Sequence, residues 1–132
     1  MYETKTCPIE HTFQHIGKKW AVHIIRDIIL GKNRFTEFLE SNPEMSAKML
    51  SKRLKELESS GLIEKVIISK NPVQVRYKLT KKGNDLKNVL FELAVFSMKN
   101  FSKNVLVNPP EKYEDKIGKM TAKKKLGMID EK

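Results

Sequence analysis

Cations and small hydroxyl groups gather in residues 46–59, in an arrangement suited to binding an anion. Leu50, Leu54 and Leu57 recur at spacings of four and three, which predicts a helix with one apolar stripe. The cations on the opposite side of that helix are Lys48, Lys52 and Lys55. Ser46 is suited to cap the helix, and the N–H groups of its first turn, together with the helix dipole, favour a bound phosphate.

We expect this helix to carry the main binding residues. Lys48, Ser51 and Lys52 could reach the base edges of a nucleic acid, whereas Arg53 lies on the flank of the helix. The predicted contacts on the helix are Ser46, Lys48, Met49, Ser51, Lys52 and Arg53. A plainer interpretation stays open, because lysines opposite a leucine stripe usually form only a solvated face.

The distribution of charge favours binding over the plainer interpretation. The chain of 132 residues has a formal net charge of +10, which favours a polyanionic partner, of which nucleic acid is the commonest. Residues 46–82 hold ten cations against three anions, so this segment alone supplies +7. The lysine-rich tail is less basic than it looks, because acidic residues offset its lysines.

The elements around the basic helix predict how it is presented. A short helix at 36–40, capped by Thr36, and a turn at 41–44 come before it. Strands at 62–69 and 73–79 follow and form a hairpin. The predicted fold is therefore mainly α with a two-stranded β-hairpin wing, a winged helix-turn-helix. The hairpin cations predicted to contact the phosphate backbone are Lys70 and Arg76.

The flanking helices predict a second copy of the chain as a partner. Pro8 opens a helix at 9–16, another runs over 19–30, and Thr80 caps a long helix at 81–103, which Gly83 weakens slightly. Apolar residues cover nearly the whole circumference of this last helix, which one side of a small domain cannot bury. The predicted dimerisation residues are Phe13, Leu90, Leu93, Phe96 and Phe101.

The predicted domain organisation is a single winged helix-turn-helix domain over 1–108, including the dimerisation helices. The hydrophobic fraction of 39% is enough for one modest core. The tail at 109–132 has no clear pattern and is expected to be partly helical or disordered.

Cys7 is the residue best placed for chemistry near the start of the chain. It precedes a proline at a predicted helix N-terminus, a position that favours the reactive thiolate. A small buried side chain near a dimer interface is the alternative. Cys7, His11 and His15 are spaced by four, so a metal site is conceivable, but short spacings recur by chance and we expect no metal. His23 is expected to be an ordinary polar residue.

Several classes of protein are disfavoured. The sequence has no glycine-rich phosphate loop, no G-x-S-x-G and no HExxH, so we expect neither an enzyme nor a cofactor. No apolar run approaches the roughly 18 residues of a membrane span, and no signal segment stands at the start. With one cysteine and therefore no intrachain disulfide, the sequence predicts a cytoplasmic protein with no membrane partner.

The order of elements resembles the HxlR-type family of winged-helix regulators from about Cys7 to Phe101. The motifs that carry this resemblance are CPIE at 7–10, IGKKW at 16–20, RFTEF at 34–38, SAKMLSKRLKEL at 46–57, GLI at 61–63, YKLT at 77–80 and Gly83. The resemblance implies a homodimer built by the first and last helices, with two recognition helices set against a roughly palindromic site. In some members of the family a cysteine at the position of Cys7 senses oxidants or electrophiles, so the resemblance implies such a role for Cys7. The tail beyond Pro110 departs from the family.

The resulting hypothesis is a transcriptional regulator that binds double-stranded DNA with 47–59 in the major groove, which admits one helix. A small-molecule or oxidant effector fits this hypothesis; aromatic residues could line its pocket but are more often core. A protein-interaction module that kept the fold without specific DNA binding is the main alternative. An RNA-binding domain is disfavoured, because no exposed stacking aromatics accompany the lysines.

Overall fold

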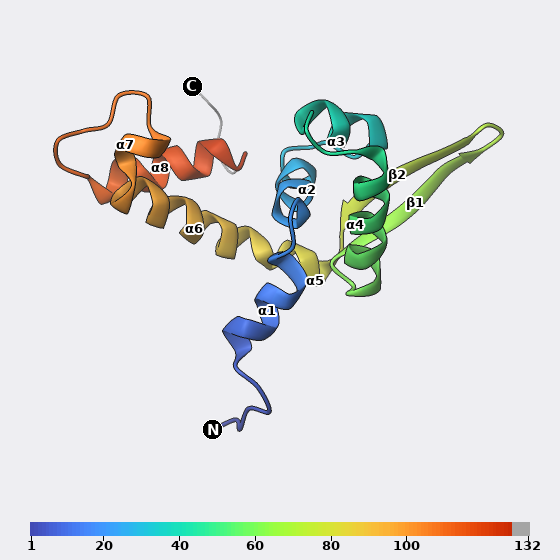
Figure 1. Ribbon diagram of the computed structural model, residues 1–132, viewed down its shortest axis with the longest axis horizontal. Coiled ribbons are helices and arrows are strands. Elements are labelled where there is room, and N and C mark those ends of the chain that lie inside the picture. Colours follow the sequence, from blue (N-terminus) through green and yellow to red (C-terminus); the bar gives the residue numbers. More distant parts are fainter. Residues whose placement is uncertain (128–132) are drawn as a thin grey trace. The chain divides into compact units, whose positions relative to one another are not determined.

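The computed structural model describes residues 1–127, which divide into two compact units with the division after Asn84 (Figure 1). The elements of the first unit are α1 (Pro8–Ile16), α2 (Ala21–Ile29), α3 (Phe35–Ser41), α4 (Ala47–Ser59), β1 (Ile63–Lys70), β2 (Val73–Leu79) and α5 (Lys81–Asn84). Those of the second are α6 (Leu86–Asn100), α7 (Ser102–Val105) and α8 (Asp115–Lys125). The predicted fold class, mainly helical with a two-stranded antiparallel hairpin, is confirmed.

One apolar core holds the helices of the first unit together. It forms where α2, α3, α4 and the start of β1 meet. Its fully buried side chains include Ile24, Ile25, Phe38, Leu50, Leu54, Leu57 and Ile63. The predicted leucine stripe is thus the face by which α4 packs on the unit, so its opposite face is turned outward.

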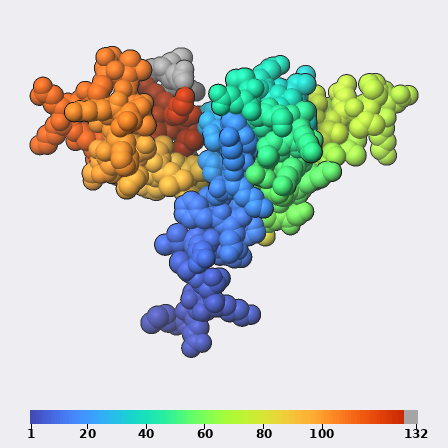
Figure 2. Space-filling view, viewed as in Figure 1, coloured from blue at the N-terminus to red at the C-terminus, as the bar shows by residue number. Residues whose placement is uncertain are grey.

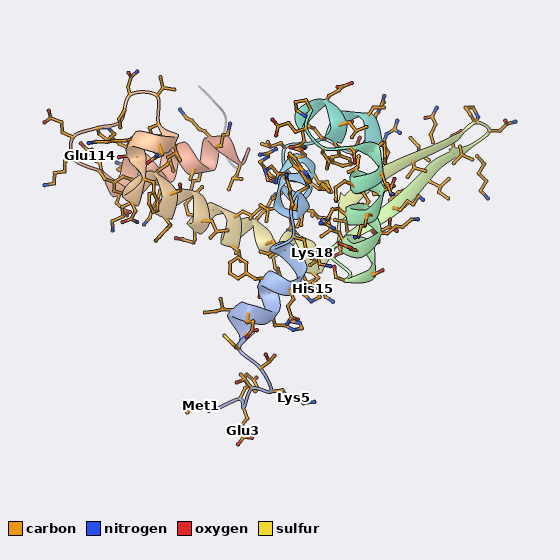
Figure 3. All side chains as sticks on the ribbon, in the orientation of Figure 1. Met1, Glu3, Lys5, His15, Lys18 and Glu114 are labelled. Atoms are coloured by element: carbon orange, nitrogen blue, oxygen red, sulfur yellow. The ribbon has the colours of Figure 1, made fainter. Side chains whose placement is uncertain are left out.

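The hairpin is anchored at its base and exposed at its tip. Tyr77 is buried, packs edge-to-face on Phe38 with 6.1 Å between ring centroids, and donates its backbone N–H to the Asn33 carbonyl at 2.9 Å. The strands pair from Ile63 opposite Leu79 outward, with an irregularity between 67 and 69. In the space-filling view the wing is a narrow projection from its unit (Figure 2), and its side chains stand out on both sides (Figure 3).

Two helix starts differ from the prediction. Trp20 has a φ of +74°, the left-handed region, so α2 begins at Ala21 and not at Lys19. Thr36 does not cap α3. That helix begins one residue earlier, and the Glu37 carboxylate accepts the backbone N–H of Arg34 at 3.1 Å.

The long helix predicted over 81–103 is interrupted twice. Asp85 separates α5 from α6, and Phe101, with φ −133° and ψ 38°, separates α6 from α7. Thr80 does cap the first piece, because its hydroxyl accepts the N–H of Gly83 at 3.0 Å. Gly83 is required there, since a Cβ would lie 1.9 Å from the Leu62 carbonyl oxygen.

The second unit includes much of the predicted tail. Helix α8 packs on α6 through a small core of Val95, Met98 and Ala122. The expected boundary after residue 108 therefore falls inside this unit, and 115–125 is helical. The part of the tail prediction that concerns 128–132 lies outside the described residues.

Candidate nucleic-acid interface

Helix α4 has the bounds and the cap that the sequence predicts. The Ser46 hydroxyl accepts the backbone N–H of Met49 at 3.0 Å, which satisfies one of the donors left free at a helix start. Leu50, Leu54 and Leu57 are at most 2% exposed. The helix is therefore held firmly by one face, as a recognition helix must be.

The opposite face of α4 presents cations to solvent. Lys48, Lys52 and Lys55 are exposed, and Met49 and Ser51 are half-buried beside them. Within the part of the chain that the structure describes, Lys48 and Lys52 form no salt bridge. No carboxylate among residues 1–127 therefore neutralises their charges, which remain available to phosphates.

The prediction that Arg53 contacts nucleic acid requires correction. Its side chain turns inward and the residue is only 8% exposed. Its Nε donates to the Lys19 carbonyl at 2.7 Å and its guanidinium binds the Glu56 carboxylate at 3.1 Å. The left-handed conformation of Trp20 follows directly after that carbonyl. Arg53 thus fastens the linker between α1 and α2 to α4, and its charge is already partnered.

A buried polar network, which was not predicted from the sequence, connects α2 with the helix-turn-helix. Asp27 on α2 is 1% exposed and accepts hydrogen bonds from Arg26 at 3.0 Å and from the Asn42 amide at 2.9 Å. The same amide also donates to the Phe38 carbonyl at 2.9 Å, so the network ties α2 to the turn before α4. A carboxylate placed among the isoleucines of α2 was the available signal, because a buried charge requires partners.

The wing provides a smaller set of cations. Lys70 is exposed at the turn, as expected for a backbone contact. Arg76 is half-buried and donates to the carbonyl of its neighbour Val75 at 3.0 Å, so it is less available than predicted. Lys65 is exposed and was missed, because the apolar residues of β1 dominate its pattern. Lys78 lies 3.0 Å from Glu64 in a solvent-exposed pair of little energetic weight.

The groups on α1 and α2 show no metal site. Cys7 is exposed at the N-cap of α1, and the Nε2 atoms of His11 and His15 lie 3.3 Å apart. Among residues 1–127 no three His, Cys, Asp or Glu side chains are placed to share a metal ion. Burial, reinforced by the positive charge of Arg26, lowers the pKa of His23, whose ring packs edge-to-face on Trp20.

The predicted dimerisation residues divide into two groups. Four side chains are 43–58% exposed and available to a partner: Phe13, Leu93, Phe96 and Phe101. Leu90 is 6% exposed, so it is already buried within the chain and the prediction for it is corrected. The exposed apolar residues on α6 lie away from the side that packs on α8.

The fold and the basic helix define a winged helix-turn-helix protein of the DNA-binding class. The model of the HxlR-like helix-turn-helix family matches residues 15–105, and the chain belongs to this family. Its relatives are transcriptional regulators, so the chain is a transcriptional regulator with a helix-turn-helix DNA-binding fold. None of the helices in the described residues is long and apolar enough to cross a membrane.

Relatives in Bacillus subtilis are similar over most of their length. The chain is 35% identical over 119 residues to the uncharacterised transcriptional regulator YdeP, covering 90% of this chain and 83% of YdeP. It is 40% identical over 92 residues to the transcriptional regulator YodB, and the match covers 69% of this chain and 82% of YodB.

Solved structures agree with these matches. Reduced YodB matches with a TM-score of 0.66 and 37% identity, covering 75% of this chain and 98% of that one. The oxidised form of the redox regulator HypR matches with a TM-score of 0.65 and 33% identity, and the match covers 71% of this chain and 97% of the HypR chain.

Proposed function

We propose that this regulator binds duplex DNA site-specifically as a homodimer, with α4 of each copy in the major groove. The observation that carries the proposal is the two-sided character of α4: its leucines are buried while Lys48 and Lys52 face solvent without carboxylate partners in the described chain. The wing cations Lys65 and Lys70 contact the phosphate backbone beside the groove.

Exposed apolar side chains support the homodimer. Phe13 on α1 and Phe96 on α6 are 51% and 58% exposed, which is costly for an isolated chain and is relieved by a second copy. A dimer with a two-fold axis presents two α4 helices to two half-sites of a roughly palindromic sequence. The half-sites are expected to lie about 34–36 Å apart, or a multiple of this, on one face of the duplex.

Footprinting tests this geometry. Protection of two major-groove segments related by a two-fold axis is the expected pattern on any duplex that the protein selects. The affinity should fall steeply with salt and exceed that for single-stranded RNA of the same sequence. A binding curve with no preference for duplex DNA would instead favour the protein-interaction module. A preference for RNA would favour an RNA-binding domain.

We further propose that Cys7 makes the protein responsive to oxidants or electrophiles. Its exposure at the N-cap of α1 supports this, as does the similarity to diamide-treated and quinone-bound forms of YodB. Because each chain has a single cysteine, diamide can form a disulfide only between two chains or with another thiol. Diamide or a quinone should release DNA from the protein, and Cys7→Ser should abolish the response. Equal release from the Cys7→Ser protein would contradict sensing by Cys7.

A further inference from the structure

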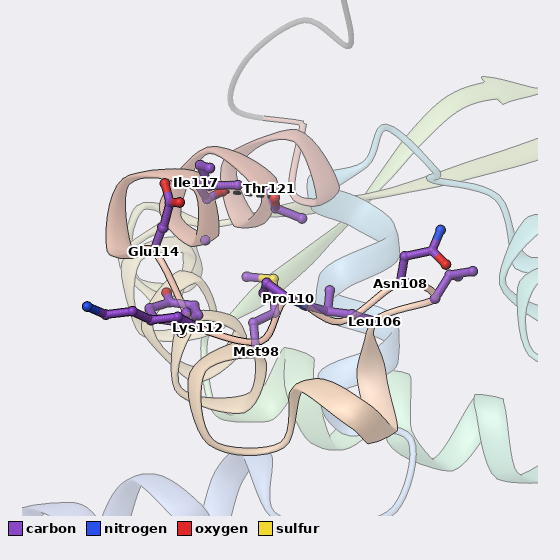
Figure 4. A pocket seen from close by; sticks show the side chains of 11 residues that line it. Met98, Leu106, Asn108, Pro110, Lys112, Glu114, Ile117 and Thr121 are labelled. Atoms are coloured by element: carbon purple, nitrogen blue, oxygen red, sulfur yellow. Dashed lines mark hydrogen bonds between the residues drawn. The ribbon is translucent and has the colours of Figure 1, made fainter.

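The second unit has a cavity of about 320 Å³ that opens to solvent and lies between α6, the segment 106–114 and α8. Figure 4 shows Met98 of α6, Leu106 and Pro110 of the connecting segment, and Ile117 of α8 around it. The volume lies at the lower end of the range of roughly 300–1,000 Å³ that is usual for small-molecule sites. Most of the lining surface is apolar, although five of the eleven lining residues carry polar side chains.

The aromatic wall of this cavity is held in an unusual way. The Tyr113 hydroxyl packs directly against Gly118, where a Cβ would lie only 2.0 Å from it. This hydroxyl is buried, and within the described residues it has no hydrogen-bond partner. Burial, reinforced by Asp115, raises the pKa of Tyr113 further above neutral pH, where a phenol is a hydrogen-bond donor in any case. A helical glycine and an unpaired hydroxyl both cost stability, and departures of this kind concentrate at functional sites.

We propose that this cavity binds a small, uncharged, mainly apolar organic molecule that carries one hydrogen-bond acceptor such as a carbonyl oxygen. The apolar body of the ligand lies against Met98, Leu106 and Ile117. Its acceptor atom accepts a hydrogen bond from the Tyr113 hydroxyl after a small tilt of the ring away from Gly118. Lys112 and Glu114, both lining residues, carry opposite charges, so the cavity has no net charge that would select an ion.

The site belongs to the part of the chain that distinguishes it from the family model. That model ends at residue 105, and of the residues lining the cavity only Met98 comes before this point. Helix α6 carries Met98 towards the cavity and exposes Leu93 and Phe96, the expected dimer contacts, elsewhere on its surface. A ligand that moves α6 would therefore alter DNA binding, and this regulatory step rests on the function proposed above.

Methionine methyl groups give a direct test on the full chain. Methyl-¹³C methionine spectra are recorded during titration with acetophenone and, separately, with ethylbenzene, which has the same shape without the carbonyl oxygen. The Met98 resonance should shift and saturate, with acetophenone binding more tightly. Met45 and Met49, in the first unit, are internal controls and should not shift. An unchanged Met98 resonance, or equal shifts at all three residues, would overturn the site.

Three variants separate the cavity from nonspecific effects. Thr121→Phe fills the cavity mouth and should abolish the saturable shift of the Met98 resonance. Lys123→Phe adds the same ring to α8 at a residue outside the lining and should bind both compounds normally. Tyr113→Phe should weaken the binding of acetophenone by roughly 2- to 12-fold, which is the effect of one neutral hydrogen bond. It should leave the affinity for ethylbenzene unchanged. Unimpaired binding by Thr121→Phe would contradict the assignment.

DNA affinity measured with and without acetophenone tests the regulatory step. A change in wild-type affinity that is absent in Thr121→Phe supports it. A shifted Met98 resonance with unchanged DNA affinity would refute regulation through this cavity, while leaving both the ligand site and DNA binding in place. Failure of the unliganded protein to bind any duplex would instead refute the proposed function alone.

Discussion

Substitution by methionine should have different effects at two neighbouring cations of α4. At Arg53 it should lower the stability of the fold, and at Lys52 it should weaken DNA binding. Arg53→Met removes a guanidinium that donates to the Lys19 carbonyl at 2.7 Å and binds Glu56 at 3.1 Å. Lys52→Met removes an exposed ammonium group one residue earlier. Methionine has nearly the helix propensity of arginine and lysine, so the helix itself is little affected in either case.

The magnitude for Arg53→Met follows from the two lost interactions. A hydrogen bond from a charged donor contributes about 1.5–3 kcal/mol, and the partly exposed pair with Glu56 adds about 0–1 kcal/mol. We expect the free energy of unfolding to fall by about 2–3 kcal/mol, since the methionine still covers part of the buried surface. With a urea m-value of about 1–3 kcal/mol/M, the midpoint should fall by about 0.7–3 M.

Two assays distinguish the variants. Urea unfolding can be followed through Trp20, the only tryptophan in the chain, which lies in the linker that Arg53 fastens. Lys52→Met should change stability by no more than about 0.5 kcal/mol. It should weaken DNA binding and reduce the slope of log affinity against log salt by about 1 per recognition helix. Full stability of Arg53→Met combined with lost DNA binding would show that the wrong face of α4 has been assigned to DNA.

Three further outcomes are expected. Leu54→Ala, in the buried stripe of α4, should lower the free energy of unfolding by about 2–5 kcal/mol in urea melts, and a loss below 1 kcal/mol would contradict the packing described here. Gly83→Ala should cost about 1–3 kcal/mol, because its Cβ would collide with the Leu62 carbonyl, whereas the exposed Lys82→Ala should be nearly neutral. The lowered pKa of His23 means that the unfolded chain binds its proton first, so stability should fall as pH drops below about 6.5. His23→Gln should remove that part of the dependence, and an unchanged pH profile would refute it.

The elements that follow from local patterns could be predicted closely from the sequence. The bounds of α4 and β2 and the cap at Ser46 agree with expectation, because leucine spacing, strand alternation and a capping hydroxyl are local signals. The fold class followed from the order of such elements. The exposed lysines of α4 could also be placed, since they lie opposite a stripe that must be buried.

The remaining features depend on contacts between residues far apart in the chain. Arg53 and Lys52 are both cations, and only the position of the Lys19 carbonyl shows which of them turns inward. The role of Asp27 likewise depends on Asn42, fifteen residues later. Helix α8 forms where its own sequence is weakly amphipathic, and its packing against Val95 and Met98 stabilises it. Charge and periodicity cannot reveal such partners.

Competition binding to the DNA upstream of the protein's own gene tests site-specific recognition by α4. Purified protein would be titrated into labelled fragments from that region in the presence of excess unrelated duplex. Saturable binding that survives the competitor and is weakened by Lys52→Met is the expected result. Binding that disappears with the competitor, or that Lys52→Met leaves unchanged, would contradict site-specific recognition by α4.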